Sequence, residues 1–196
     1  MFLPRDIVSG DFYWFHKLEN GTVMLAVADC TGHGVPGAMM SMIGHSLLNE
    51  IILENGITEP AQVLYQLNTK LIAALNQADP GSDANDGMDI AVCRINQVDR
   101  KLCFAGAYRP LFLIRDGELI LVKGDPYPIG GGHFDLEREY KCHSMELKKG
   151  DLLYVFSDGY PDQFGGDKNK KFLKRLKKLL VDNHQTSLEA GRHSYR

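Results

Sequence analysis

In the first part of the chain, the spacing of apolar residues changes from that of a strand to that of a helix. Residues 23–28 form an unbroken apolar run of strand length, and residues 35–55 carry apolar side chains at helical spacing, with Pro36 in the first turn. The turn between them, CTGHGVPG, is rich in glycine. Asp29 stands at the tip of the strand, where an uncharged turn residue would be more usual. This strand, turn and helix are therefore the first candidate for a functional site.

The remaining pattern predicts a chain rich in strands. Residues 7–16 alternate enough for a strand, residues 61–78 have helical spacing, and residues 79–87 have loop composition. Further strands are predicted for residues 88–96, 101–105, 111–115, 118–123, 137–145 and 151–157, and a short amphipathic helix for residues 168–178. Asp116-Gly117 predicts a hairpin turn. The glycine-rich stretch 127–132 is interpreted as a turn rather than a flap.

Aspartates recur where the predicted strands begin or end. Asp158 follows the last predicted strand, which repeats the pattern of Asp29. Asp11 follows a glycine within the first predicted strand, a pattern that indicates a bulge or a close backbone approach. Asp89 lies at the start of another strand and could reach the same end as Asp29, although a strand-edge aspartate is more commonly just solvated. We expect Asp11, Asp29 and Asp158 to converge.

Converging carboxylates indicate a metal site. They repel one another unless cations neutralise them, and oxygen ligands suit the hard ions Mg²⁺ and Mn²⁺. His33 is the one histidine near these residues in the sequence, and no His/Cys cluster accompanies it, so zinc is not expected. A helix-start histidine packing near Pro36 is the simpler interpretation of His33.

The glycine-rich turn also allows a nucleotide-binding interpretation. Residues 32–37 fit the G-x-G-x-x-G spacing that lets a backbone approach a pyrophosphate. A dinucleotide-binding unit needs a strand after the helix, however, and residues 61–78 predict a second helix instead. Asp29 would also face the pyrophosphate with a negative charge. The metal interpretation is therefore preferred.

Composition narrows the protein class only moderately. The 196 residues are 44% hydrophobic, which suits one domain with a sizeable core. A net charge of −3 gives no reason to expect nucleic acid or an anionic membrane as a partner. The four cysteines form no C-x-x-C pair, and the chain shows no signal peptide or membrane-length apolar run, so a cytoplasmic location is expected. The parent protein could still be anchored to a membrane through another segment.

Five motifs in order resemble one known family. They are SGDFYW (9–14), VADCTGHGVPGAMMS (27–41), DGMDIAV (86–92), FAGAYRPLFLIRDGE (104–118) and VFSDGYPDQFGG (155–166). Together they resemble the SpoIIE/RsbU-like branch of the bacterial metal-dependent protein phosphatase (PPM) superfamily. The resemblance implies an α+β fold, a four-layer α-β-β-α sandwich with two central antiparallel sheets. We expect the domain to span residues 1–183 and to be trimmed at both ends, with residues 184–196 as a tail that need not belong to it.

The resemblance also implies roles for individual residues. Asp11 resembles the ligand of one metal ion, Asp29 the aspartate that bridges two ions and orients the water between them, and Asp158 a ligand of the other ion. The main-chain carbonyl of Cys30 resembles a further ligand. That water would attack a phosphoserine or phosphothreonine in line. Weaker candidates for the site are Asp89, His33 and Asp162.

Departures from the family pattern affect the metal prediction. The family usually closes with an Asp-Asp pair, and nothing after Lys171 supplies it, so one of two expected Mn²⁺ or Mg²⁺ ions should bind weakly. No arginine stands in the register that eukaryotic relatives use for phosphate; Arg5 is near but displaced. His33 follows Asp29 by four residues rather than the two at which a proton-donating histidine occurs in those relatives.

The implied function is a serine/threonine protein phosphatase domain of a bacterial signalling protein. Its expected substrate is a phosphorylated protein, with an anti-anti-sigma factor as one candidate, and an upstream sensor or regulatory domain is expected outside these residues. Neither nucleic acid nor a membrane segment is expected, and the sequence does not indicate an oligomeric state. The alternative is a catalytically degenerate phosphatase fold that acts as a regulatory or binding module.

Overall fold

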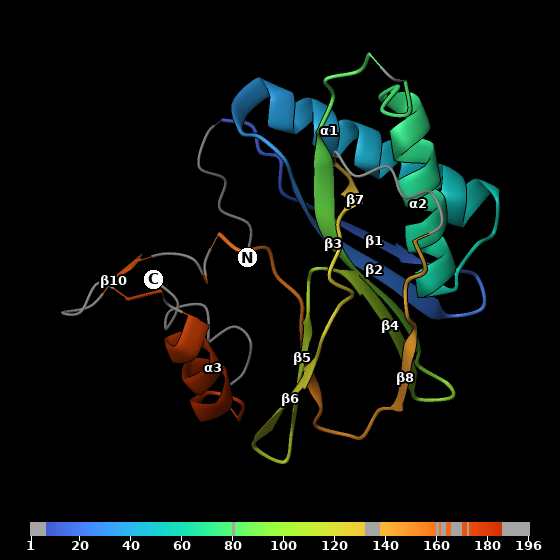
Figure 1. The fold of residues 1–196 in the computed structure, drawn as a ribbon. Helices are drawn as coiled ribbons and strands as arrows, with labels where there is room; N and C mark the ends of the chain where they lie inside the picture. Colours follow the sequence, from blue (N-terminus) through green and yellow to red (C-terminus); the bar gives the residue numbers. More distant parts are fainter. Residues whose placement is uncertain are drawn as a thin grey trace.

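The computed structural model describes residues 7–79, 81–131, 138–159, 161, 164–165, 170–171 and 173–185. Its main sheet has the strand order β1-β2-β3-β4-β8, and β7 pairs with β3 off this path (Figure 1). The bounds of these strands are β1 (Phe12–Lys17), β2 (Thr22–Cys30), β3 (Gly87–Asn96), β4 (Lys101–Ala107), β7 (Ile129–Gly130) and β8 (His143–Glu146). All the pairings are antiparallel.

A second antiparallel sheet faces the first. It has the order β6-β5-β9, with β6 (Glu118–Val122), β5 (Leu111–Arg115) and β9 (Leu152–Tyr154). Buried side chains of β3, β4 and β5 form one apolar cluster between the sheets; its members are Ala91, Cys93, Leu102, Phe104 and Leu111. The predicted hairpin at Asp116-Gly117 is confirmed, since it joins β5 to β6. A small hairpin, β10 (Phe164–Gly165) with β11 (Lys170–Lys171), lies near the C-terminus.

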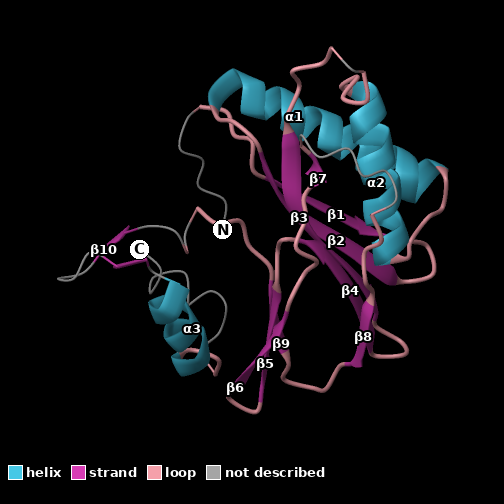
Figure 2. Cartoon of the chain, viewed as in Figure 1, coloured by secondary structure: helices cyan, strands magenta, loops and turns pink. Residues whose placement is uncertain are grey.

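Helices cover the outer face of each sheet. On the first sheet lie α1 (Gly34–Leu48), the π-helix η1 (Asn49–Glu54) and α2 (Pro60–Ala74), which share a large apolar core with β2 and β3 (Figure 2). On the second sheet, Leu176 and Leu180 of α3 (Leu173–Asp182) pack against Phe112 and Ile114 of β5. The order of layers is therefore helices, sheet, sheet, helix. The predicted α-β-β-α sandwich is confirmed.

Local chemistry sets where the helices begin and end. Pro60 opens α2, and the Glu59 carboxylate caps it by accepting a hydrogen bond of 2.8 Å from the Gln62 amide. The helix ends at residue 74 rather than at the predicted 78, because Asn76 adopts a positive φ of 49° that an α-helix does not allow. The predicted helix 35–55 is an α-helix whose last part widens into η1.

Several strands are shorter than the pattern predicts. β1 begins at Phe12 rather than residue 7, β9 covers only Leu152–Tyr154 of the predicted 151–157, and β8 begins at His143 rather than 137, a residue outside the described ranges. The stretch 127–132 is more than a turn, because Ile129–Gly130 pairs with the start of β3 as β7. The Asn68 side chain of α2 holds this pairing by accepting a hydrogen bond of 2.9 Å from the Gly130 amide.

An ion pair between Arg115 of β5 and Asp151, the residue before β9, links two strands of the second sheet and leads to a stability prediction. Arg115 donates to both carboxylate oxygens of the nearly buried Asp151, from Nε to Oδ1 at 2.9 Å and from Nη2 to Oδ2 at 2.6 Å. These bonds, with one from the Lys148 amide, hold the pKa of Asp151 below its ordinary value of 3.8. A lowered pKa in the folded state means that the ionised Asp151 stabilises the protein above pH 3.8, and that this contribution is lost as the pH falls further.

We therefore expect Asp151→Asn to lower the melting temperature at pH 7 by a few degrees. The difference from the parent protein should shrink as the pH falls below 3.8 towards the lowered pKa of the folded parent, where its carboxylate also becomes neutral. Thermal unfolding followed by circular dichroism between pH 3 and 7 measures it. A difference that does not depend on pH would show that the amide acts through packing rather than through charge.

Candidate active site

The four strand-end aspartates lie at one edge of the fold. Asp29 and Asp89 are direct cross-strand partners in β2 and β3. Asp11 precedes β1 and adjoins Asp29, because Phe12 pairs with Ala28, and its carboxylate lies close enough to raise the pKa of Asp29. Asp158 follows β9 on the second sheet, and its backbone amide donates to Asp29 Oδ2 at 3.3 Å. The expected convergence of Asp11, Asp29 and Asp158 is thus present, and Asp89 joins it.

The glycine-rich turn makes this convergence possible by close backbone packing. A Cβ on Gly37 would lie 2.7 Å from the Gly32 carbonyl oxygen, and one on Gly10 would lie 3.0 Å from the same oxygen and 3.2 Å from the Cys30 carbonyl oxygen. Any larger residue at position 37 would therefore push α1 away from the turn. The glycines bring the start of α1, the end of β2 and the residue before Asp11 into contact.

Arg109 is the centre of the acidic cluster. It lies in the connection between β4 and β5, and its side chain is only 13% exposed. Its Nη2 lies 2.8 Å from Asp29 Oδ2, 3.0 Å from Asp89 Oδ2 and 3.2 Å from Asp158 Oδ2. An Nη2 amino group has two hydrogens, so three carboxylates share two donors. The residues that the sequence places on three separate strands meet at this one nitrogen.

The backbone around Arg109 is tightly fixed. The Tyr108 amide donates to the Asp125 carbonyl at 2.8 Å, and Tyr108 itself has a positive φ of 59°. The Arg109 carbonyl presses against Gly106 and Gly124, where a Cβ on Gly124 would lie 2.7 Å from it. These two glycines are therefore needed for the close approach that aims Arg109 at the aspartates. The sequence pattern does not single out Arg109, although it stands inside the motif FAGAYRPLFLIRDGE, because spacing along the chain does not show which residues a connection between two sheets will face.

The cluster carries more negative charge than Arg109 can neutralise. Burial raises the pKa of Asp29 to about 7; Arg109 opposes this shift, and the neighbouring Asp11 and Asp158 add to it. Burial is also the main cause of a raised pKa at Asp89, again opposed by Arg109. Four carboxylates against one guanidinium make a site that favours further cations.

The carboxylates are of the kind that binds hard divalent ions, but in this structure they contact Arg109. Oxygen ligands at the edge of the sheets match Mg²⁺ or Mn²⁺. Among the described residues, however, no three His, Cys, Asp or Glu side chains stand together in the arrangement of a metal-ligand set. The carboxylates are instead turned towards Nη2 of Arg109. The oxygen ligands that such ions prefer are therefore gathered here, with a guanidinium among them.

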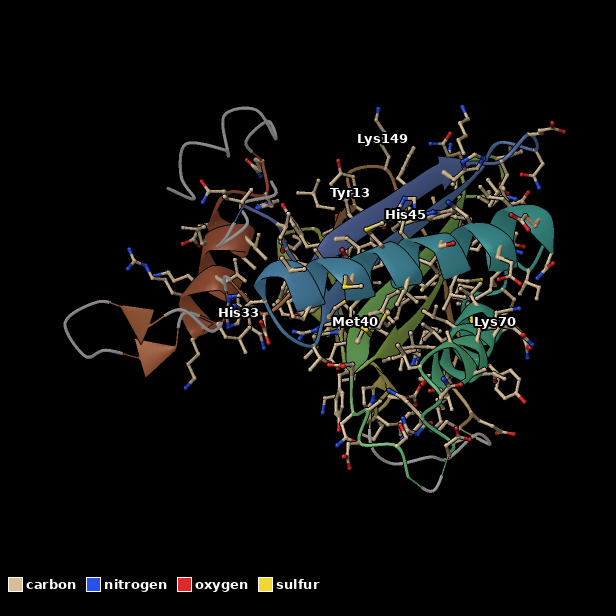
Figure 3. The ribbon with its side chains drawn as sticks, turned by 90° about the horizontal axis from the view of Figure 1, so that it is seen from above. Tyr13, His33, Met40, His45, Lys70 and Lys149 are labelled. Carbon is tan, nitrogen blue, oxygen red and sulfur yellow. The ribbon has the colours of Figure 1, made fainter. Side chains whose placement is uncertain are left out.

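The other predicted residues lie at different distances from this cluster. Cys30 ends β2 beside Asp29, with its carbonyl oxygen packed near Gly10. His33 is the exposed N-cap residue of α1 (Figure 3). Its proposed packing near Pro36 stays a prediction. Asp162 lies outside the described residues.

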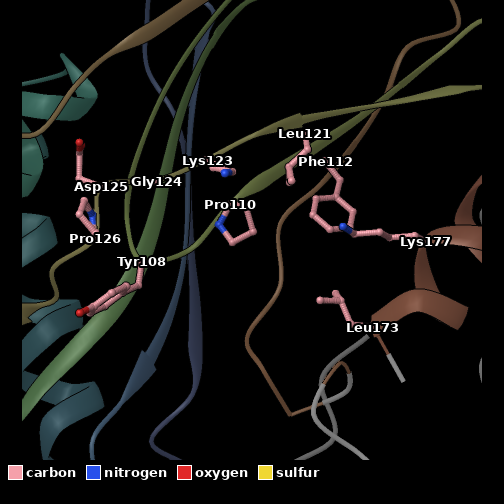
Figure 4. A pocket seen from close by; sticks show the side chains of 10 residues that line it. All are labelled: Tyr108, Pro110, Phe112, Leu121, Lys123, Gly124, Asp125, Pro126, Leu173 and Lys177. Carbon is pink, nitrogen blue, oxygen red and sulfur yellow. The ribbon is translucent and has the colours of Figure 1, made fainter. Parts of the chain in front are cut away.

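A pocket opens next to the acidic cluster. It has a volume of about 280 Å³, and Tyr108 and Pro110, the neighbours of Arg109, are on its wall (Figure 4). Phe112 also lines it and packs edge-on against Phe156, two residues before Asp158, with ring centroids 5.0 Å apart. The pocket therefore shares the β4–β5 connection that presents Arg109, while its other walls come from β6, the residues that follow β6, and α3.

The two-sheet sandwich with an acidic edge defines a class, the PP2C-type protein phosphatase fold. The SiaA-PP2C domain of Pseudomonas aeruginosa has the same fold, with a TM-score of 0.85 and 30% identity over 98% of this chain and 73% of that one. Residues 19–193 match the family model of stage II sporulation protein E (SpoIIE). The chain belongs to the SpoIIE family, as its motifs predicted.

Curated relatives share the same region at lower identity. The phosphoserine phosphatase RsbU of Bacillus subtilis (strain 168) is 29% identical over 161 residues, which are 80% of this chain and 44% of the relative. Stage II sporulation protein E of the same organism is 29% identical over 182 residues, 90% of this chain and 20% of the relative. The chain thus spans less than half the length of these relatives. No helix in the described part of the chain is long and apolar enough to cross a membrane.

Proposed function

We propose that this chain is the catalytic domain of a serine/threonine protein phosphatase that works with two divalent ions, Mn²⁺ or Mg²⁺. The observation that carries the proposal is the meeting of Asp29, Asp89 and Asp158 at one point, with Asp11 in contact with Asp29. Membership of the SpoIIE family supports it, as does the name of the relative RsbU, a phosphoserine phosphatase. A degenerate regulatory module would have no need to keep the four carboxylates together.

The position of each residue suggests its part in the reaction. Asp29 is the most enclosed of the three carboxylates that contact Arg109, with 18% of its side chain exposed against 52% for Asp158. We assign it the bridging role and the orientation of the attacking water. Asp11 and the Cys30 carbonyl would complete one side of the centre, and Asp158 and Asp89 the other. The ions, when bound, supply a water of lowered pKa and neutralise the charge of the phosphate.

Asp89 is the natural replacement for the missing Asp-Asp pair. It is fixed opposite Asp29 by the β2 and β3 register, and its side chain is 27% exposed, so it is open enough to accept an ion. We propose that Asp89 is a metal ligand. With Asp89, the second ion should bind more tightly than expected from the missing Asp-Asp pair, but still weakly. Besides the bridging Asp29, Asp89 and Asp158 would serve that ion, where the family usually provides an Asp-Asp pair as well.

The pocket beside Arg109 suits the chain that flanks a phosphoserine. Its walls combine the apolar side chains of Pro110 and Phe112 with two lysines, Lys123 and Lys177, against one carboxylate, the mostly buried Asp125. Lys177 lies over the ring of Phe112, with Nζ 5.4 Å from the ring centroid. The pocket therefore favours a segment with an apolar residue and acidic neighbours. A phosphorylated signalling protein, for which an anti-anti-sigma factor is one candidate, and a sensor or regulatory domain in the parent protein remain parts of this proposal.

Charge reversal tests this part of the proposal. Lys177→Glu should raise KM for an acidic phosphoserine peptide by about tenfold and leave kcat nearly unchanged, because the lysine would attract the peptide without touching the phosphate. Steady-state hydrolysis of matched acidic and neutral phosphopeptides measures the change. Lys149→Glu is the control, since Lys149 does not line the pocket (Figure 3). Equal effects of the two variants would exclude the pocket as the docking site.

The proposed activity itself is tested by release of phosphate. The purified chain should hydrolyse a phosphoserine peptide when Mn²⁺ is present and should not do so in excess chelator. A well-folded protein that releases no phosphate from phosphoserine or phosphothreonine peptides at any Mn²⁺ or Mg²⁺ concentration up to about 10 mM, well above the weak end of oxygen-ligand affinities, would support the regulatory module instead.

A further inference from the structure

Arg109 occupies the place where a divalent ion would have to bind. A metal ion held by Asp29 and Asp158 must lie about 2.0–2.6 Å from their oxygens. Nη2 of Arg109 lies 2.8 Å from Asp29 Oδ2 and 3.2 Å from Asp158 Oδ2. An ion placed where these Oδ2 atoms meet would lie too close to Nη2 for both to stay, and the two cations would repel each other. We propose that Arg109 is a built-in competitor of the metal ions, which holds the carboxylates in the metal-free protein and is displaced when an ion binds.

This inference rests on the proposed metal site and adds a residue that controls its affinity. A guanidinium is charged at every physiological pH, so the competitor is always available. In its absence, Asp11, Asp29, Asp89 and Asp158 would repel one another in a partly enclosed site. Arg109 thus stabilises the metal-free protein, and the same stabilisation must be given up when an ion takes its place. With Arg109 present, filling the site should therefore need a higher ion concentration than the carboxylates alone would require.

The surroundings of Arg109 are suited to such a displacement. Its backbone is fixed by the contacts with Gly106 and Gly124, so a change of position is confined to the side chain. Nε of Arg109 is buried, and no hydrogen-bond partner for it is found among the described residues. The recorded bonds of the guanidinium to the cluster all come from Nη2. An incoming ion therefore has to replace the bonds of a single nitrogen atom.

Arg109→Gln tests the competition in the whole chain. Without the cation, Mn²⁺ should bind about ten- to a hundredfold more tightly by isothermal titration calorimetry, the range expected when charge-assisted hydrogen bonds no longer compete. The melting temperature in EDTA should fall, and the rise in melting temperature on adding Mn²⁺ should grow. Arg115→Gln is the matched control. It breaks the ion pair with Asp151, so it should lower the melting temperature without changing Mn²⁺ affinity.

A second measurement separates displacement from simple repulsion between two cations. In the unaltered protein, Mg²⁺ titration should shift the side-chain nitrogen and proton NMR signals of Arg109, and the signals should show faster rotation of the guanidinium as its carboxylate partners are lost. This measurement also decides the matter should Arg109→Gln fail to fold. Unchanged Arg109 signals at saturating Mg²⁺, or Mn²⁺ affinity that is equal or weaker in Arg109→Gln, would overturn the inference.

These outcomes are independent of the proposed phosphatase activity. A chain that hydrolyses phosphopeptides, with metal affinity insensitive to Arg109, would retain the proposed function and lose this inference. A chain without hydrolysis, in which Arg109→Gln tightens Mn²⁺ binding and Mg²⁺ moves the guanidinium, would retain this inference alone.

Discussion

Asp29→Asn is expected to lower Mn²⁺-dependent hydrolysis of a phosphoserine peptide by about a thousandfold. Asp29 is the residue that the other parts of the cluster share, since its Oδ2 accepts from Arg109 at 2.8 Å and from the Asp158 amide at 3.3 Å, and its side chain contacts Asp11. An amide keeps the shape of the carboxylate and removes the charge that would hold two ions. The expected loss is of the order found when one group that stabilises the transition state electrostatically is removed.

The fold should survive this substitution. Asp29→Asn removes an ion pair with Arg109 but also removes repulsion from Asp11 and Asp158, so the two effects on stability oppose each other. Circular dichroism and a melting curve in EDTA check this. Asp116→Asn is the matched control, because Asp116 is exposed in the hairpin between β5 and β6 and adopts a positive φ that asparagine also tolerates. Near-normal turnover of Asp29→Asn would remove Asp29 from its proposed role.

Removal of metal ions is expected to abolish hydrolysis altogether. The proposed attack uses a water activated by the ions, so it should stop when they are removed. Two features predict that restoration needs Mn²⁺ in the range of about 1 mM, the weak end of oxygen-ligand affinities. The Asp-Asp pair usual in the family is absent after Lys171, and Arg109 competes for the oxygens of Asp29, Asp89 and Asp158.

Dialysis against a chelator, followed by Mn²⁺ titration of phosphate release, measures this dependence. Mg²⁺ serves as the second ion, and Ca²⁺ as a larger one with less strict geometry. Full turnover in the chelated protein would contradict a metal-bound nucleophile. Full restoration of activity at micromolar Mn²⁺ would contradict weak binding of the second ion. It would indicate that Asp89, or Asp162 outside the described residues, completes the site.

Periodicity predicted most of the fold because the elements bury regular faces. The strand at residues 23–28 and the helix after it became β2 and α1, and the Asp116-Gly117 turn lies where its residues require. The antiparallel sheet and the second helix α2 also exclude the dinucleotide-binding interpretation of residues 32–37. Those glycines serve close packing around Gly37 instead.

Strand ends and tertiary partners were harder to predict from the same pattern. β7 exists because Asn68 of α2 accepts a hydrogen bond from Gly130, a contact between residues 62 positions apart. The sequence does not reveal the importance of Asp89, because nothing in it fixes the register that places Asp89 opposite Asp29. The same holds for Arg109. Its importance comes from a connection between two sheets, and the spacing of residues along one strand carries no information about that connection.

The central claim is that Asp11, Asp29, Asp89 and Asp158 form a divalent-metal centre, and anomalous X-ray diffraction from crystals grown with Mn²⁺ tests it most directly. We predict a manganese peak on the carboxylate oxygens of Asp29, with a second, weaker peak on the side of Asp158 and Asp89, and Arg109 turned away from them. Crystals of a protein that hydrolyses phosphoserine with Mn²⁺, but with no manganese peak at these four residues, would contradict the account.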